Sequence, residues 1–118
     1  MGVVRVKRVY DKEAKEDGYR VLVDRLWPRG VKKEELTIDE WAQDVAPSDD
    51  LRKWYGHDPQ RFTEFTRRYR AELRREPGAG VMARLQERAA HTTVTLLTAT
   101  KDVDHSAAVV LAKQLGPG

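Results

Sequence analysis

The pattern of apolar and polar residues changes along the chain, and three segments of it predict β-strands. Between residues 3 and 9, valines alternate with basic residues, which is typical of a strand with one buried face. Residues 19–24 contain three consecutive apolar side chains, and an apolar run on both faces of a strand favours a central position in a sheet. Residues 92–98 are rich in β-branched side chains, so we expect a third strand there.

Apolar residues at helical spacing predict helices between and after these strands. Ser48 stands before two aspartates as a helix N-cap, and Asp58-Pro59 begins the next helix in a similar way. Residues 37–45 fit either a helix or a short strand that carries Trp41 inward. We therefore expect helices over residues 31–36, 49–55, 59–76, 81–90 and 105–115, and a frayed end at 116–118.

The order of these elements predicts the fold class. Strands come first, helices follow, and the last strand leads directly into the last helix. We expect one α/β domain over residues 1–118, with a small mixed or mainly parallel sheet flanked by helices. A chain of 118 residues fits a single domain, and it contains no internal repeat and no long linker.

Composition narrows the chemistry of the chain. The absence of cysteine excludes disulfides, thiol nucleophiles and cysteine-bound metals. The charged content of 35% predicts an ionic surface, while a net charge of +3 only weakly favours nucleic acid as a partner. The sequence has no secretory signal, no apolar run of the ~18 residues that a membrane span needs, no zinc-ligand spacing and no glycine-rich phosphate loop. We therefore expect a cytoplasmic protein with no membrane contact, no metal and no cofactor.

Several short stretches that cover most of the chain resemble one family. The most specific is the run Leu26-Trp27-Pro28-Arg29-Gly30, and the others lie at residues 6–11, 18–25, 46–48, 51–59 and 94–97. Over about residues 4–115 the chain is similar to the small bacterial YeaO-like proteins of the domain-of-unknown-function 488 family. The resemblance implies an α/β fold and a bacterial cytoplasmic protein, and it implies no established reaction.

The run from Asp24 to Gly30 places polar side chains directly after the strand that we expect to be central. Open α/β sheets bind ligands at the carboxyl ends of their strands. Arg25 and Arg29 offer two guanidinium groups for a phosphate or carboxylate, and the intervening proline stiffens the turn. Trp27 can stack on a base or cover the pocket. The alternative is structural: Asp24 pairs with Arg25 or Arg29, and Trp27 belongs to the core.

The second polar run, from Lys101 to Ser106, links the last strand to the last helix. A helix start next to a strand end binds anions through its free N–H groups and its dipole, and Lys101 adds charge. We expect Asp104 or Asp102 to cap the helix and Ser106 to contact the ligand. His105, neutral beside a helix start, is a candidate general base. The alternative is a solvated cap with a surface histidine.

The resemblance bears on this second run as well. Larger members of the family carry a cysteine near a His-Arg pair after the last strand. This chain has Lys101-Asp102-Val103-Asp104-His105-Ser106 there, so their thiol chemistry does not carry over.

If the two strands are neighbours, both polar runs open on one edge of the sheet. The side chains that would then converge are Asp24, Arg25, Arg29, Lys101 and His105. The leading hypothesis is a binding protein or enzyme for a small anionic ligand, and we expect this ligand to carry phosphate. In an enzyme, Asp24 or His105 would be the general base, and the arginines would stabilise negative charge.

Two further hypotheses use other surfaces. A nucleic-acid-associated protein would use the arginine-rich helix over residues 61–75, with Arg67, Arg68, Arg74 and Arg75. Acidic residues lie among these arginines, and an i,i+4 pair from Glu64 to Arg68 favours an ordinary solvated face. A protein-interaction module without catalysis would instead have aromatic residues such as Trp54 and Tyr55 partly exposed as a contact patch. We interpret His57 as part of the turn between two helices.

Overall fold

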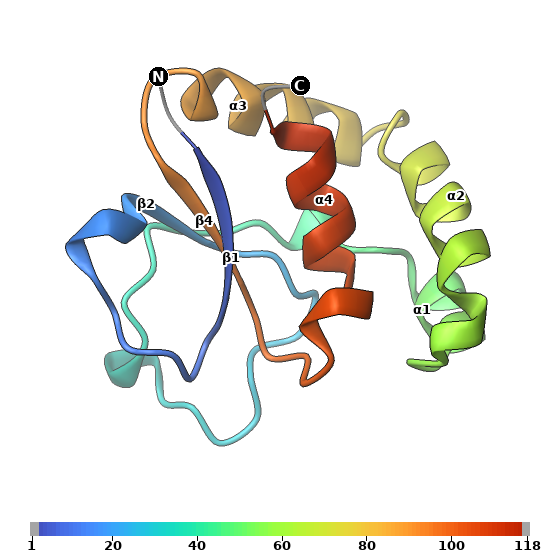
Figure 1. Cartoon of the computed structure of the whole chain (residues 1–118), viewed down its shortest axis with the longest axis horizontal. Coiled ribbons are helices and arrows are strands. Elements are labelled where there is room, and N and C mark those ends of the chain that lie inside the picture. The colour runs from blue at the N-terminus through green and yellow to red at the C-terminus, as the bar shows by residue number, and fades with distance from the viewer. Residues whose placement is uncertain (1–2, 117–118) are drawn as a thin grey trace.

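The computed structural model describes residues 3–116 and contains a four-stranded sheet (Figure 1). Its strands are β1 (Val4–Arg8), β2 (Tyr19–Leu22), β3 (Glu40–Trp41) and β4 (Val94–Thr98). They lie in the order β1-β4-β2-β3, and each neighbouring pair is parallel. The expected α/β class is therefore confirmed, and within residues 3–116 the sheet is parallel throughout.

The two central positions of the sheet belong to β2 and β4, as the apolar pattern of residues 19–24 predicted for β2. All five residues of β4 are buried. Successive side chains point to opposite faces, so Val21 and Leu96 belong to the larger hydrophobic core, whereas Leu22 and Leu97 belong to a smaller one. Both faces of these strands are covered, which explains the consecutive apolar residues Val21-Leu22-Val23 and Leu96-Leu97.

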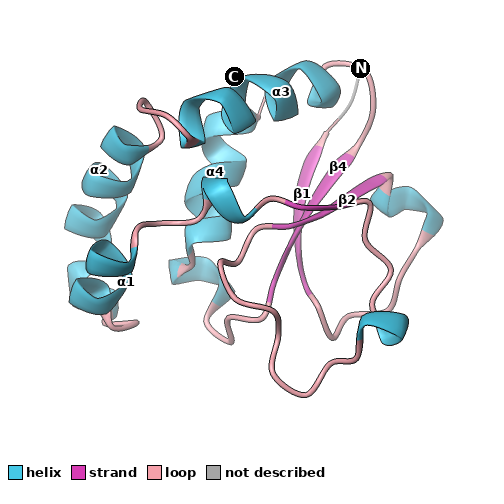
Figure 2. Ribbon diagram, turned by 180° about the vertical axis from the view of Figure 1, so that it is seen from behind, coloured by secondary structure: helices cyan, strands magenta, loops and turns pink. Residues whose placement is uncertain are grey.

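Four helices lie on one side of the sheet (Figure 2): α1 (Asp49–Tyr55), α2 (Phe62–Glu72), α3 (Gly78–Ala89) and α4 (Ala107–Leu115). α3 and α4 pack against the strands, α2 packs against α4, and α1 packs against α2. The other face is covered by residues of the long segment 23–39, such as Trp27 and Leu36. The described helices longer than one turn therefore flank one face of the sheet and not both.

Several expected elements differ in extent from those observed. The helix expected over residues 59–76 is a 3-10 turn, Pro59–Arg61, followed by α2, which ends at Glu72. Residues 31–36 form one 3-10 turn, Lys33–Glu35, because Val31 and Leu36 on either side of it pack onto the smaller core and keep the segment extended. The ambiguous segment 37–45 contains the short strand β3 and a 3-10 turn. α3 begins three residues before the expected start at residue 81. Of the expected frayed end, residues 117–118 lie outside the described part of the chain.

The expected helix start at Ser48 is confirmed. Its hydroxyl oxygen accepts a hydrogen bond from the backbone N–H of Leu51 at 3.2 Å. Glu72, at the end of α2, accepts from both the backbone N–H and the hydroxyl of Ser48, at 2.8 and 2.6 Å. This cap therefore also ties α1 to α2, directly after residues 46–47.

A buried ion cluster lies on the sheet face away from the helices, near the amino end of β2. Asp17 is 1% exposed and accepts a hydrogen bond from Lys7 Nζ at 2.9 Å. It also pairs with Arg20, which is 4% exposed. The hydroxyl of Thr95 on β4 donates to the backbone oxygen of Asp17 at 2.7 Å. In the sequence, Asp17-Gly18 is recognisable only as a turn. The ion cluster cannot be read from the sequence, because its two cations, Lys7 and Arg20, come from different strands.

Candidate ligand-binding site

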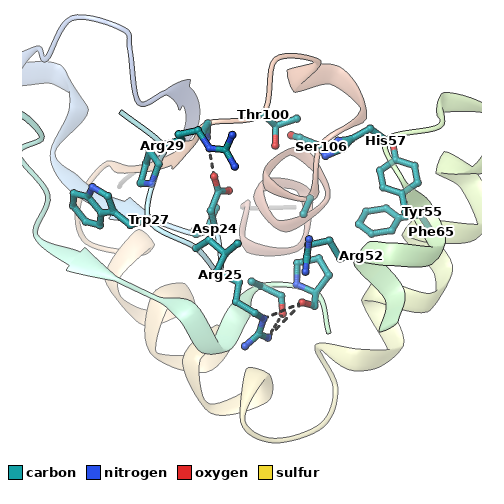
Figure 3. A pocket seen from close by; sticks show the side chains of 17 residues that line it. Asp24, Arg25, Trp27, Arg29, Arg52, Tyr55, His57, Phe65, Thr100 and Ser106 are labelled. Atoms are coloured by element: carbon teal, nitrogen blue, oxygen red, sulfur yellow. Dashed lines mark hydrogen bonds between the residues drawn. The ribbon is translucent and has the colours of Figure 1, made fainter. Parts of the chain in front are cut away.

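A pocket of about 240 Å³ opens at the carboxyl end of β2 and β4 (Figure 3). β2 and β4 are hydrogen-bonded neighbours, so the two polar runs that follow them meet at one edge of the sheet. A second hollow continues from the pocket and shares Asp24, His57, Ala99 and Thr100 with it. The pocket is lined by Val23, Asp24, Arg25, Leu26, Trp27, Pro28, Arg29, Ala46, Pro47, Arg52, Tyr55, His57, Phe65, Ala99, Thr100, Ser106 and Ala107.

Asp24 lies between the two hollows and is held by the end of β4. Its carboxylate accepts hydrogen bonds from the Thr98 hydroxyl at 2.7 Å and from the Ala99 backbone N–H at 2.8 Å. Its backbone oxygen accepts from the indole N–H of Trp41 at 2.7 Å. Burial raises the pKa of Asp24 above its usual value, although these two hydrogen bonds and the nearby His57 act in the opposite direction.

Arg25 follows Asp24 directly but points away from the pocket centre (Figure 3). Its guanidinium donates to the backbone oxygens of Ala46 and Pro47 at 3.3–3.4 Å. It also lies 3.9 Å from a carboxylate oxygen of Asp49. Arg25 therefore holds the 46–47 segment against the strand end, and it forms this wall of the pocket instead of presenting a free cation.

Trp27 packs on the far side of the turn from the helices. Its ring meets that of Trp41 edge to face at 5.4 Å, and its indole N–H donates to the backbone oxygen of Val31 at 2.6 Å. It packs against the smaller core. These contacts fit the core alternative for Trp27, although one side of the residue still lines the pocket.

Arg29 and Lys101 are exposed cations that line the two hollows that meet at Asp24. Arg29 lines the pocket, and Lys101 lines the adjoining hollow. Neither side chain forms a hydrogen bond or ion pair with any of residues 3–116. Arg29 stands between the buried Pro28 and Gly30, whose φ is 79°. The structural alternative of an ion pair between Asp24 and Arg25 or Arg29 is wrong in the described part of the chain, since no such pair forms.

The start of the last helix differs from the expectation. α4 begins at Ala107, and its N-cap is Ser106, whose hydroxyl oxygen accepts from the Val109 N–H at 3.4 Å and donates to the Val103 backbone oxygen at 2.6 Å. The expected caps, Asp104 and Asp102, are wrong because a 3-10 turn, Val103–His105, separates them from the helix. Ser106 is buried and lines the pocket, as a ligand-contacting residue would.

His105 does not line the pocket or the adjoining hollow. Its Nδ1 lies 2.8 Å from Asp102, and its ring meets the edge of Phe62 at 5.2 Å. Its backbone oxygen accepts from the hydroxyl of Tyr55 at 2.6 Å. Asp102 orients the imidazole of His105, as expected of an aspartate here. The imidazole nevertheless lies outside both hollows that Asp24 lines.

Sequence reasoning missed two features of the site. His57 lines both hollows, and it has a left-handed backbone with φ 57° in the turn after α1. Thr98 supplies a buried hydroxyl to Asp24 and sits 3.2 Å from the hydroxyl of Thr100, which lines the pocket. The sequence contained a signal for the threonine pair, because Thr98 and Thr100 stand at the end of a predicted strand. No local signal places His57 beside Asp24, because the two lie on separate elements.

The structure also describes the surfaces expected for nucleic-acid binding and for protein interaction. Glu64 pairs with Arg67 at 2.6 Å and with Arg68 at 2.7 Å, which confirms the i,i+4 pair and gives two of the four arginines proposed for nucleic acid an acidic neighbour. Tyr55 is 5% exposed, so the expected exposure of this ring is wrong: it stacks on Phe65 at 4.2 Å. Trp54 is half-buried beneath the guanidinium groups of two arginines.

Within residues 3–116, no group of three His, Asp or Glu side chains is arranged to hold a metal ion. None of the helices in that range has the length and apolar character needed to cross a membrane.

Comparison with known proteins places the chain in a family. The family model described as the inactive DUF488-N3 subclade matches residues 3–117. The uncharacterized protein Rv3073c of Mycobacterium tuberculosis is 46% identical over 112 residues, which is 95% of this chain and 92% of that protein. The uncharacterized protein YeaO of Escherichia coli is 42% identical over 112 residues, 95% of this chain and 96% of YeaO. No solved structure matches the chain significantly. The chain therefore belongs to the YeaO-like DUF488 family of bacterial proteins.

Proposed function

We propose that this protein binds a small anionic ligand, with a phosphate or carboxylate group, in the pocket at the carboxyl edge of β2 and β4, and that it works in the bacterial cytoplasm. One observation carries the proposal. Arg29 and Lys101 approach the same strand ends from two different loops, and within residues 3–116 neither has an acidic partner. Free cations at the carboxyl edge of a parallel sheet favour an anion there.

The other charges of the pocket support this assignment. Arg25 is bound to backbone oxygens, and Arg52 lies 3.4 Å from Asp49, so both are already engaged. Arg29 and Lys101 are thus left to meet a ligand. The rest of the lining combines apolar residues, such as Leu26, Pro28 and Phe65, with the polar side chains of Thr100 and Ser106.

Binding without catalysis fits the site better than a reaction. The matching family model is described as an inactive subclade. The Ser106 hydroxyl is engaged in capping α4, and His105 lies outside the pocket. Of the Ser and Thr hydroxyls that line the pocket within residues 3–116, Ser106 donates to a backbone oxygen and Thr100 accepts from Thr98, so neither is paired with a base in the way that covalent catalysis requires.

Replacing both free cations tests the proposal. Arg29→Ala combined with Lys101→Ala should weaken the binding of inorganic phosphate or pyrophosphate at least ~10-fold, because one charge-assisted hydrogen bond contributes about 1.5–3 kcal/mol. Isothermal titration calorimetry at constant ionic strength measures the change.

The matched control removes two exposed cations elsewhere, Lys53→Ala with Arg74→Ala, and changes the net charge by the same amount. Its affinity should stay within about twofold of the wild type. Equal weakening in both double variants would mean that phosphate responds only to net charge. That result, or wild-type protein that binds neither anion, would refute the proposal.

A further inference from the structure

The Asp24 carboxylate has acceptor capacity that the protein does not use. Its two oxygens each accept one hydrogen bond, from Thr98 and from Ala99. An ionised carboxylate offers roughly four lone-pair positions. Asp24 lines both the pocket and the adjoining hollow, so its remaining positions are open to a bound molecule.

The same carboxylate also has no cationic partner. Within residues 3–116 it forms no ion pair, although arginines stand one and five residues further along the chain. Arg25 is held by the oxygens of Ala46 and Pro47, and the backbone of Asp24 is fixed by Trp41. A partly buried charge without a partner is unfavourable, and a cation that fills the site restores the balance.

The space around Asp24 has two connected parts. The pocket measures about 240 Å³ and the adjoining hollow about 500 Å³, so together they have room for a molecule with two charged ends. The Asp24 side chain lines both parts, Arg29 lines the pocket, Lys101 lines the adjoining hollow, and apolar side chains such as Leu26 and Phe65 line the pocket. Apolar walls suit a short aliphatic chain that joins two charged ends.

We propose that the ligand is zwitterionic: an ammonium or guanidinium group donates to Asp24, and the anionic group lies against Arg29 and Lys101. Asp24 is then a binding residue that selects for a cationic nitrogen. This inference rests on the proposed anion site but adds a second, separate contact. The other charged or titratable side chains that line the two hollows are Arg25, Arg52, Tyr55, His57 and Asp102.

Three probes separate the two contacts. Agmatine carries only cationic nitrogen, inorganic phosphate carries only the anion, and L-arginine carries both kinds of group. The wild type should bind L-arginine at least ~10-fold more tightly than agmatine, because it can use both ends of the site. Asp24→Asn should lower the affinity for agmatine at least ~10-fold and leave the affinity for phosphate unchanged or higher. The double variant Arg29→Ala with Lys101→Ala should lower the affinity for phosphate and leave the affinity for agmatine unchanged or higher.

A measurement on unmodified protein covers the case in which Asp24→Asn does not fold. Carboxyl-detected NMR follows the titration of Asp24, and saturating agmatine should lower its apparent pKa, since a bound cation favours the ionised form. No shift of that pKa, or agmatine binding that is equal in the wild type and Asp24→Asn, overturns the zwitterion inference. Phosphate binding that still depends on Arg29 and Lys101 would then leave the anion site standing. Agmatine binding that needs Asp24, without phosphate binding, would refute the anion site instead.

Discussion

Asp17→Asn should destabilise the protein by about 3–5 kcal/mol, because removing one partner of a buried ion pair leaves the other charge uncompensated. Asp17 and Arg20 are almost fully buried, and Lys7 donates to both carboxylate oxygens, at 2.9 and 3.0 Å. Asparagine has nearly the same shape, so the loss reports charge rather than packing. Urea unfolding followed by circular dichroism measures it.

The control for this prediction is Glu64→Gln on the outer face of α2. Glu64 also pairs with two arginines, at 2.6 and 2.7 Å, but both pairs are exposed. Exposed ion pairs contribute little, so the urea midpoint should hardly move. Similar losses for the two variants would show that burial of the Asp17 cluster does not matter.

The Asp17 cluster also predicts a pH dependence. Burial alone would raise the pKa of Asp17, but hydrogen bonds from Lys7, from the Ala14 backbone and from Arg20 outweigh it and leave the pKa below the usual 3.8. A carboxyl with a lowered folded pKa contributes stability fully above its unfolded pKa and loses it as the pH falls through the folded value. Below pH 3.8 the wild type should therefore lose stability faster than Asp17→Asn, and the two curves should converge. Curves that stay parallel would contradict this account.

Gly18→Ala should cost about 3 kcal/mol or more, because two effects act at once. Gly18 has φ +63°, and an added Cβ would lie 2.3 Å from the backbone oxygen of Thr93. That oxygen also accepts the N–H of Tyr19 at 2.9 Å, so it cannot move without disturbing the start of β2. The change is read from the same urea unfolding experiment.

Gly56→Ala separates backbone strain from the clash at Gly18. Gly56 also has a positive φ, +53°, but the nearest atom to its added Cβ is the Lys53 oxygen at 3.7 Å, an ordinary contact. Strain alone should cost about 1–2 kcal/mol there. If the two variants lost the same free energy of unfolding, the close approach between Gly18 and Thr93 would not help to hold β2 beside β4.

The local patterns of the sequence were sufficient to predict β1, β2 and β4 and the edge of the sheet at which the pocket opens. Three apolar residues in succession predicted that β2 is central, and the polar run after it fell at the carboxyl edge because the strand ends there. The direct connection from β4 to α4 placed Lys101 and Ser106 at the same edge. Each of these inferences depends on residues that are adjacent in the chain, so a sequence pattern carries them.

The directions of the side chains could not be read in the same way. Arg25 was expected to grip a ligand, but its partners are the oxygens of Ala46 and Pro47, which lie more than twenty residues further on. His105 was grouped with Asp24, but the 3-10 turn before α4 rotates it toward Phe62. Both outcomes are set by packing between distant segments, which local propensity does not encode.

The most direct test of the central claim is a titration of isotope-labelled protein with inorganic phosphate, followed through backbone amide chemical shifts. We predict saturable shifts in residues 24–30 and 98–107, the two runs that meet at the carboxyl ends of β2 and β4. Shifts confined to the arginine-rich residues 61–75, or no saturable shifts at all, would contradict an anion site at this edge of the sheet.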